Sequence, residues 1–136
     1  MKNQVTSIGQ SKRLIEMGVP AEKASMVWEM DEDCARLKIW NTDKETRRIL
    51  HNKYPNYYVP AFTVADLLSV LPKTITNSKG GVHKLHIEVC SSTNHCWCLF
   101  WGDEEIQIGW CERISFLHLI EDATEWLLSN GYKLNL

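Results

Sequence analysis

The sequence lacks the features that mark several large classes of protein. No apolar run approaches the roughly 20 residues that span a bilayer, so we expect no membrane segment. No apolar stretch follows Lys2 at the N-terminus, so we expect no signal peptide. There are 15 lysines and arginines against 17 aspartates and glutamates. The resulting net charge of −2 argues against nucleic acid or an anionic membrane as the partner.

Catalytic motifs are also missing. The chain contains no Gly-x-Ser-x-Gly and no His-Glu-x-x-His. Gly80 and Gly81 form no phosphate loop, because neither a Gly-Lys-Ser/Thr sequence nor a predicted helix follows them. We therefore predict no catalytic residue, no metal ligand and no cofactor, and favour a non-enzymatic protein.

Length and composition favour one ordinary domain covering residues 1–136. With 44% hydrophobic residues, the chain can bury a core without a metal or disulfide. The five cysteines are an odd number and no secretion signal is visible, which favours reduced thiols and a cytoplasmic protein. The chain has six tryptophans, which is many for its length. Proteins with so many tryptophans expose an aromatic interaction surface more often than average proteins of this size.

The order of predicted elements indicates an α+β protein, with helices packed on a mainly antiparallel sheet. Predicted helices cover residues 7–17, 63–72 and 112–129, with a short helical turn at 20–24. Predicted strands form a hairpin, 26–30 with 35–40, and a three-stranded meander, 82–90, 95–101 and 104–110. Residues 42–59 show no clear pattern, and residues 73–81 are expected to be a connection.

Capping residues define the ends of these helices. Thr6 or Ser7 can cap the first, and Gly18 ends it. Thr63 caps the second, with Asp66 completing a capping-box pair.

The last predicted helix is apolar over a wide arc, which predicts contacts on more than one side. Gly131 suits the left-handed position that ends it. Its polar positions form one stripe: His118, Asp122, Glu125 and Ser129. The acidic side chains, Glu121 included, are expected to be solvated.

The meander allows a register to be predicted. Burying Leu85, Ile87 and Val89 together with Trp97, Leu99 and Trp101 pairs Leu85 with Trp101, Ile87 with Leu99 and Val89 with Trp97. A two-residue turn beginning at Gly102 would pair Trp101 with Glu104. This pairing would add three more residues to the buried face: Ile106, Ile108 and Trp110.

The opposite face of the meander is the main candidate interaction site. It would carry His86, Glu88, Cys90, Cys96, Cys98, Phe100, Glu105 and Gln107. Cys90 and Cys96 would be direct neighbours, with Cβ atoms about 5 Å apart. This face can be a metal site, a reactive-thiol site, or cysteines that pack as small apolar residues under a helix, residues 42–59 or a partner.

We favour packing. Cys96-x-Cys98 is not a Cys-x-x-Cys knuckle, and His86 and Cys90 would lie about 13 Å apart along one strand. A reactive cysteine needs a nearby cation or a helix N-terminus, whereas these cysteines lie beside Glu88.

A second candidate site lies in residues 44–58, where Arg47, Arg48 and Lys53 lie near His51 and three tyrosines, Tyr54, Tyr57 and Tyr58. Basic residues between aromatic ones can bind single-stranded nucleic acid. The acidic balance of the chain argues against that function, and a solvated loop anchored by its tyrosines is favoured.

Several stretches together resemble a group of small uncharacterised proteins from gut anaerobic bacteria and their prophages and mobile elements. They are Val5-Thr6-Ser7-x-x-Gln10-Ser11 running to Leu14, residues 18–26, residues 60–72 and Asn130-Gly131-Tyr132. The resemblance implies an accessory protein in a bacterial or phage context and supplies no functional residue. The tryptophan content, the broadly apolar last helix and the apolar, cysteine-bearing sheet face lead us to expect a protein-interaction module that self-associates or binds another protein. The alternatives are a metal- or thiol-dependent enzyme using Cys90, Cys96 and Cys98, and a weak nucleic-acid binder.

Overall fold

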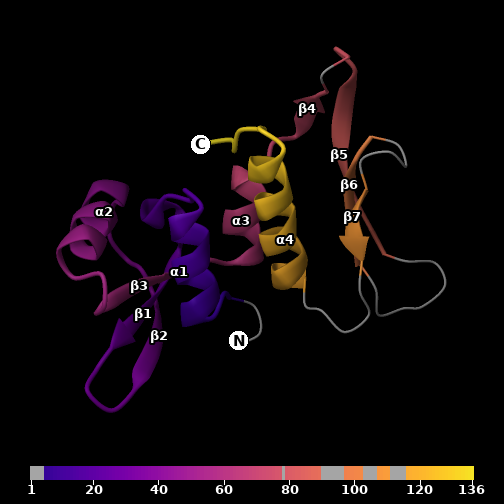
Figure 1. Cartoon of the computed structure of the whole chain (residues 1–136). Helices are drawn as coiled ribbons and strands as arrows, with labels where there is room; N and C mark the ends of the chain where they lie inside the picture. Colours follow the sequence, from indigo (N-terminus) through magenta and orange to yellow (C-terminus); the bar gives the residue numbers. More distant parts are fainter. Residues whose placement is uncertain (1–4, 78, 90–96, 103–106, 111–115) are drawn as a thin grey trace. The chain divides into compact units, whose positions relative to one another are not determined.

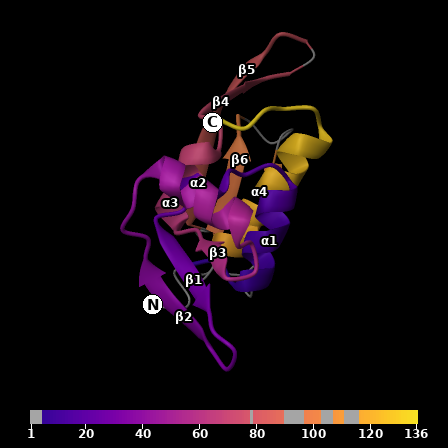
Figure 2. The ribbon, with the colours of Figure 1, turned by 90° about the vertical axis from the view of Figure 1, so that its left-hand side faces the viewer.

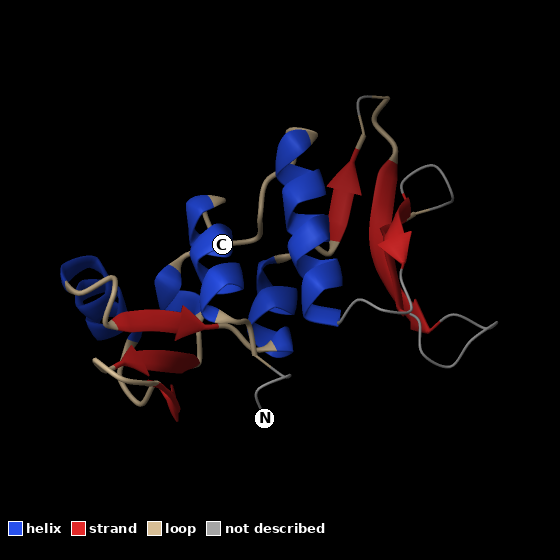
Figure 3. Ribbon diagram, turned by 60° about the horizontal axis from the view of Figure 1, so that its bottom comes forward, coloured by secondary structure: helices blue, strands red, loops and turns tan. Residues whose placement is uncertain are grey.

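The computed structural model describes residues 5–77, 79–89, 97–102, 107–110 and 116–136. It confirms the α+β class, with helices and two antiparallel sheets (Figures 1 and 3). Contacts divide the chain into two compact units, one up to Val70 and one from Leu71 to Asn135. The expectation of a single domain stays a prediction. None of the described helices combines the length and apolar character needed to cross a membrane.

The first unit contains a three-stranded sheet with the strand order β2-β1-β3. Its elements are α1 (Ile8–Glu16), the 3-10 turn η2 (Ala21–Lys23), β1 (Met26–Met30), β2 (Ala35–Ile39), α2 (Lys44–Lys53), β3 (Tyr58–Ala61) and α3 (Val64–Val70). The β1–β2 hairpin matches the prediction, and its turn projects beyond the helices of this unit (Figures 1 and 2). The sequence pattern had predicted neither α2 nor β3.

Capping explains where α1 begins and ends. Ser7 Oγ accepts from the Gln10 backbone N–H at 3.2 Å, and Gln10 Oε1 accepts from the Ser7 N–H at 2.9 Å. Gly18 then adopts φ 109°, a conformation that glycine tolerates, and the Val19 N–H donates to the Leu14 carbonyl at 3.0 Å. Both predicted ends of this helix are confirmed.

A buried polar network joins the start of α1 to the sheet. The Thr6 hydroxyl accepts from the Phe62 N–H at 2.9 Å and lies 2.7 Å from the Ser11 hydroxyl. The Trp28 indole N–H donates to the Thr6 carbonyl at 3.0 Å. These partners satisfy polar groups that would otherwise be costly to bury.

The predicted capping box at the start of α3 is confirmed and extended. The Asp66 N–H donates to the Thr63 hydroxyl, and the Thr63 N–H donates to Asp66 Oδ2. The same oxygen also accepts from the Ser25 N–H at 2.9 Å and the Ser25 hydroxyl at 2.8 Å. One carboxylate therefore caps a helix and fastens the residue before β1.

The second unit contains a four-stranded sheet with the order β4-β5-β6-β7. Its elements are β4 (Thr74–Thr76), β5 (Val82–Val89), β6 (Trp97–Trp101), β7 (Gln107–Trp110) and α4 (Phe116–Ser129). Strand β4 lies in the segment expected to be only a connection. The β5–β6 register is confirmed, with Leu85 opposite Trp101 and Ile87 opposite Leu99.

The predicted β6–β7 pairing is wrong. Leu99 pairs with Ile108 and Phe100 with Gln107, so Glu104 is not the partner position of Trp101. A bulge between Cys98 and Leu99 then places Trp110 opposite Cys98. Gly102 does adopt a positive φ of 78°, as the turn prediction required, and the His83 ring occupies the space that a Cβ atom there would need. The pairing of Leu99 is offset by two residues from the predicted one, and the bulge shifts the register once more on the side away from Gly102.

Helix α4 packs on β6 and β7. Trp101 is fully buried, its indole N–H donates to the Pro72 carbonyl at 2.8 Å, and its ring stacks on Trp126 at 6.2 Å. Leu85 is half-buried and Ile87 is 37% exposed, which corrects the expectation that Ile87 is buried. The main contacts of α4 lie on β6 and β7, so β5 receives less cover.

The polar stripe of α4 is confirmed, because His118, Asp122, Glu125 and Ser129 are all exposed. Glu121 is buried, so the expectation that it is solvated was wrong. The helix ends at Gly131, with φ 80°, and the Tyr132 N–H donates to the Leu127 carbonyl. That end is as predicted.

Candidate functional site

The structure places part of the predicted meander face. His86 is exposed and its strand partner is Phe100, while Glu88 pairs with Cys98. Cys90 and Cys96 lie outside the described residues, so the face as a whole stays a prediction. Within the part of the chain that the structure describes, no group of three His, Cys, Asp or Glu side chains could hold a metal ion.

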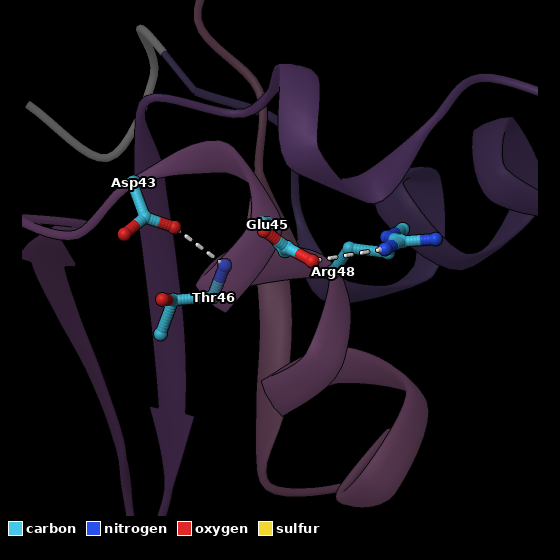
Figure 4. Close-up of polar contacts among 4 residues, drawn as sticks. All are labelled: Asp43, Glu45, Thr46 and Arg48. Atoms are coloured by element: carbon cyan, nitrogen blue, oxygen red, sulfur yellow. Dashed lines mark hydrogen bonds and ion pairs between the residues drawn. The ribbon is translucent and has the colours of Figure 1, made fainter.

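Residues 44–58 form an ordered structure and not the loop that was favoured. Asp43 caps α2, because its Oδ1 accepts from the Thr46 N–H at 2.7 Å (Figure 4). This bond lowers the pKa of Asp43. Glu45 and Arg48 form a loose ion pair at 3.8 Å (Figure 4).

Arg47 has a structural role. Its Nε donates to the Thr42 carbonyl at 3.0 Å, and its terminal nitrogens donate to the carbonyls of Trp40 at 3.1 Å, Ala24 at 2.9 Å and Glu22 at 3.4 Å. The guanidinium fork therefore fastens α2 to η2 and to the end of β2. Because its donors are engaged in this way, Arg47 is a poor candidate for binding a phosphate.

The tyrosines that follow α2 pack on one another. Tyr57 and Tyr58 meet edge to face at 4.7 Å, and Tyr54 lies 6.3 Å from Tyr58. Lys53 Nζ lies 5.4 Å from the centre of the Tyr54 ring. This cluster sits at the start of β3, where the chain turns into the sheet.

The β3 edge of the sheet is closed. The Met30 N–H donates to the Tyr57 carbonyl, so the alternation of an antiparallel ladder turns the Tyr58 carbonyl and the Pro60 nitrogen away from β1. His51 Nδ1 lies 2.9 Å from the Tyr58 carbonyl and donates to it. Pro60 has no N–H to offer a further strand. Helix α2 lies along this side of the sheet (Figure 2).

The β2 edge is open. The Trp40 N–H donates to the Ser25 carbonyl and the Asp31 N–H to the Cys34 carbonyl. The same alternation therefore turns the backbone N–H and C=O groups of Ala35, Leu37 and Ile39 outward, and the Ile39 carbonyl already accepts from the Asn41 N–H at 3.0 Å. No other described strand pairs with these groups.

One face of the sheet is apolar, and its burial falls toward β2. In one row across the strands, Ala61 is fully buried, Met26 is half-buried and Ile39 is 75% exposed. In the next row, Val59 and Trp28 are buried and Leu37 is half-buried. Helix α1 packs on β3, so the apolar side chains at the open edge receive less cover.

The other face of this edge is charged. Lys38 forms an ion pair with Glu29 at 2.9 Å, and Glu29 is also the strand partner of Arg36. A hydrogen bond to the Cys34 side chain, with the nearby Asp31 carboxylate, raises the pKa of Arg36. Arg36 is therefore charged at physiological pH. Sequence reasoning missed this edge because it depends on where β3 pairs.

A hollow of about 410 Å³ in the second unit lacks the features of a binding site. Pro72, Lys73, Thr74 and residues 133–135 line it, and none of them is buried. Without a buried polar group, nothing in this hollow would hold a ligand in one orientation.

No protein-family model, no curated protein and no solved structure matches the chain.

Proposed function

We propose that the chain is a protein-interaction module that binds an extended segment of another protein as an added strand on β2. The observation that carries this proposal is the difference between the two edges of one sheet. Pro60 and His51 close the β3 edge, whereas β2 presents outward backbone groups beside an exposed apolar side chain. Strand addition uses backbone hydrogen bonds for affinity and alternate side chains for specificity. The resemblance implies a bacterial or phage protein, and we propose that context for the interaction as well.

An open edge strand is also a hazard, because it can pair with unrelated chains. Proteins commonly protect such an edge with proline, a bulge, charged side chains or a covering element. The β3 edge has a proline and a covering helix, whereas β2 has only the charges of Arg36 and Lys38, which disfavour pairing with like-charged strands and leave its backbone groups accessible to others.

Site-specific photo-crosslinking in the native host tests the proposal. A photoreactive amino acid replaces the exposed Ala35 on β2 or, as the matched control, the exposed Ile49 on α2. We expect a discrete adduct from position 35 alone. Adding Ile39→Pro removes an outward N–H without breaking the β1–β2 ladder, and should reduce that adduct several-fold.

Two results would contradict the proposal. One is the same set of adducts from positions 35 and 49. The other is an adduct at position 35 that Ile39→Pro leaves unchanged. Circular dichroism of the Ile39→Pro variant confirms that the sheet is intact before either result is interpreted.

A further inference from the structure

We infer that the segment that binds β2 is apolar on one face and carries two acidic residues on the other, an inference that rests on the proposed function. The two faces of the open edge differ in chemistry. Leu37 and Ile39 lie on the apolar face, whereas Arg36 and Lys38 lie on the opposite face. The side chains of an added strand would point alternately to the apolar and the charged face of the sheet, so the strand would extend both faces.

The positions opposite Arg36 and Lys38 are the ones that meet most closely. Leu37 and Ile39 would share the backbone hydrogen bonds with the added strand, so the residues between them form the non-hydrogen-bonded pairs. Side chains in such pairs lie roughly 4.5–5.5 Å apart at Cβ, close enough for charge to affect pairing.

The strand residues on this face carry two cations and one carboxylate. They are Val27, Glu29, Arg36, Lys38, Tyr58 and Pro60. Glu29 forms an ion pair with Lys38 and is the strand partner of Arg36, and the Asp31 carboxylate of the turn also acts on Arg36. An acidic residue opposite Arg36 or Lys38 on an added strand would be attracted to that cation, whereas a basic residue there would be repelled.

A second copy of the chain does not fit. Three registers of antiparallel self-pairing bring at least two of the outward residues Ala35, Leu37 and Ile39 into pairs, and they are centred on Arg36, Leu37 and Lys38. They place Arg36 opposite Arg36, Arg36 opposite Lys38, and Lys38 opposite Lys38, respectively. Each of these three registers sets like charges face to face, which is destabilising.

The hairpin turn limits the length of the acidic stretch. Asp31, Glu32 and Asp33 are exposed at the turn beyond the open edge. A segment that stayed acidic alongside the turn would be repelled there. The inferred ligand therefore carries its acidic residues opposite Arg36 and Lys38 and neutral or basic residues beside the turn.

Two synthetic peptides of equal length test the inference on the full chain. One is Val-Glu-Val-Glu-Val and the other is Val-Lys-Val-Lys-Val, so that the two charged residues lie opposite Arg36 and Lys38 and not beside the turn, and both have neutral ends. Binding is followed by NMR at the backbone amides of Leu37 and Ile39. We expect the glutamate peptide to bind about tenfold more tightly, because two charge pairs change sign between the peptides.

Charge reversal supplies the matched comparison. The double variant Arg36→Glu and Lys38→Glu should reverse the preference and favour the lysine peptide. The double variant Lys44→Glu and Arg48→Glu makes the same change in net charge on exposed positions of α2, and should leave the preference unchanged.

The outcomes separate the inference from the proposed function. Equal binding of both peptides, blocked by Ile39→Pro, overturns the inferred charge pattern and leaves the docking edge standing. No binding at millimolar peptide, or binding that Ile39→Pro leaves unchanged, overturns the docking edge itself. A dimer in light scattering that Ile39→Pro dissociates overturns the exclusion of a second copy.

Discussion

Helix α4 buries Leu117, Ile120 and Leu127, whereas every residue of α2 keeps part of its surface in solvent. Hydrophobic burial holds α4 on its sheet. By contrast, α2 is held by polar groups: the Asp43 cap, the Arg47 fork and the His51 bond to the Tyr58 carbonyl. The comparison shows that a short helix without a buried face can be fixed by hydrogen bonds to backbone carbonyls. Substitutions in the two helices should therefore have different effects.

Truncation of the α4 core should have the largest effect. Ile120→Ala removes a fully buried side chain, and we expect the free energy of unfolding to fall by about 3 kcal/mol. Urea unfolding followed by fluorescence measures the change. His118→Ala, at an exposed position of the same helix, is the control and should change stability by less than about 0.5 kcal/mol. Similar losses from both variants would show that burial does not hold α4.

Adjacent arginines in α2 provide a sharper test. Arg47→Ala should lower the free energy of unfolding by about 2 kcal/mol, because several carbonyls lose a charged donor. Arg48→Ala removes a side chain that is 54% exposed, and should cost less than about 0.5 kcal/mol. Urea unfolding of both variants measures the difference.

Arg47→Lys should restore little of the lost stability, since an ammonium group cannot match the planar fork. Equal losses from Arg47→Ala and Arg48→Ala would refute the fastening role of Arg47.

Replacing the glycine that ends α4 should change the free energy of unfolding by a smaller amount. Gly131 has φ 80°, so Gly131→Ala should destabilise the chain by about 1 kcal/mol. Gly9 lies inside α1 with open space around it, so Gly9→Ala should stabilise by roughly 0.5–1 kcal/mol. Thermal unfolding compares the two. A change of the same sign for both would contradict the assigned conformations.

The cap of α2 should give the smallest effect, visible as a pH dependence. The hydrogen bonds from Thr46 lower the pKa of Asp43 below its unfolded value. The carboxylate therefore stabilises the fold above the unfolded pKa, and this contribution is lost as the pH falls through the folded pKa.

Below about pH 5, the stability of the parent chain should consequently fall more steeply than that of Asp43→Asn, whose amide can still cap. Urea unfolding across that range measures both slopes. Glu45→Gln controls for the loss of one negative charge from the same turn. Parallel curves for the parent chain and Asp43→Asn would contradict the prediction.

The stretches that carry the resemblance acquire a structural explanation. Thr6 and Ser11 belong to the buried network at the start of α1. Thr63 and Asp66 form the capping box that also binds Ser25. These residues hold the first unit together, and none of them lies on the β2 edge.

The two helices also differ in how far the sequence predicted them. The buried face of α4 is visible in the sequence as a repeating apolar pattern, and Gly131 marks the end of the helix. The described part of α4 was therefore predicted. Helix α2 has no apolar stripe, and its main attachment joins Arg47 to carbonyls as distant as residue 22. Asp43 was the one local signal that could have revealed it, as an N-cap residue at the start of a helix.

What the sequence by itself determined is local: the caps at Ser7 and Thr63, the glycine ends of α1 and α4, and the pairing parity of β5 and β6. These features depend on residues a few positions apart or on simple alternation. Only the tertiary structure decided that β3 pairs with β1, that a bulge shifts β7, and that β2 is left as an open edge. Those outcomes depend on pairing between distant segments, and many side chains set its energy together.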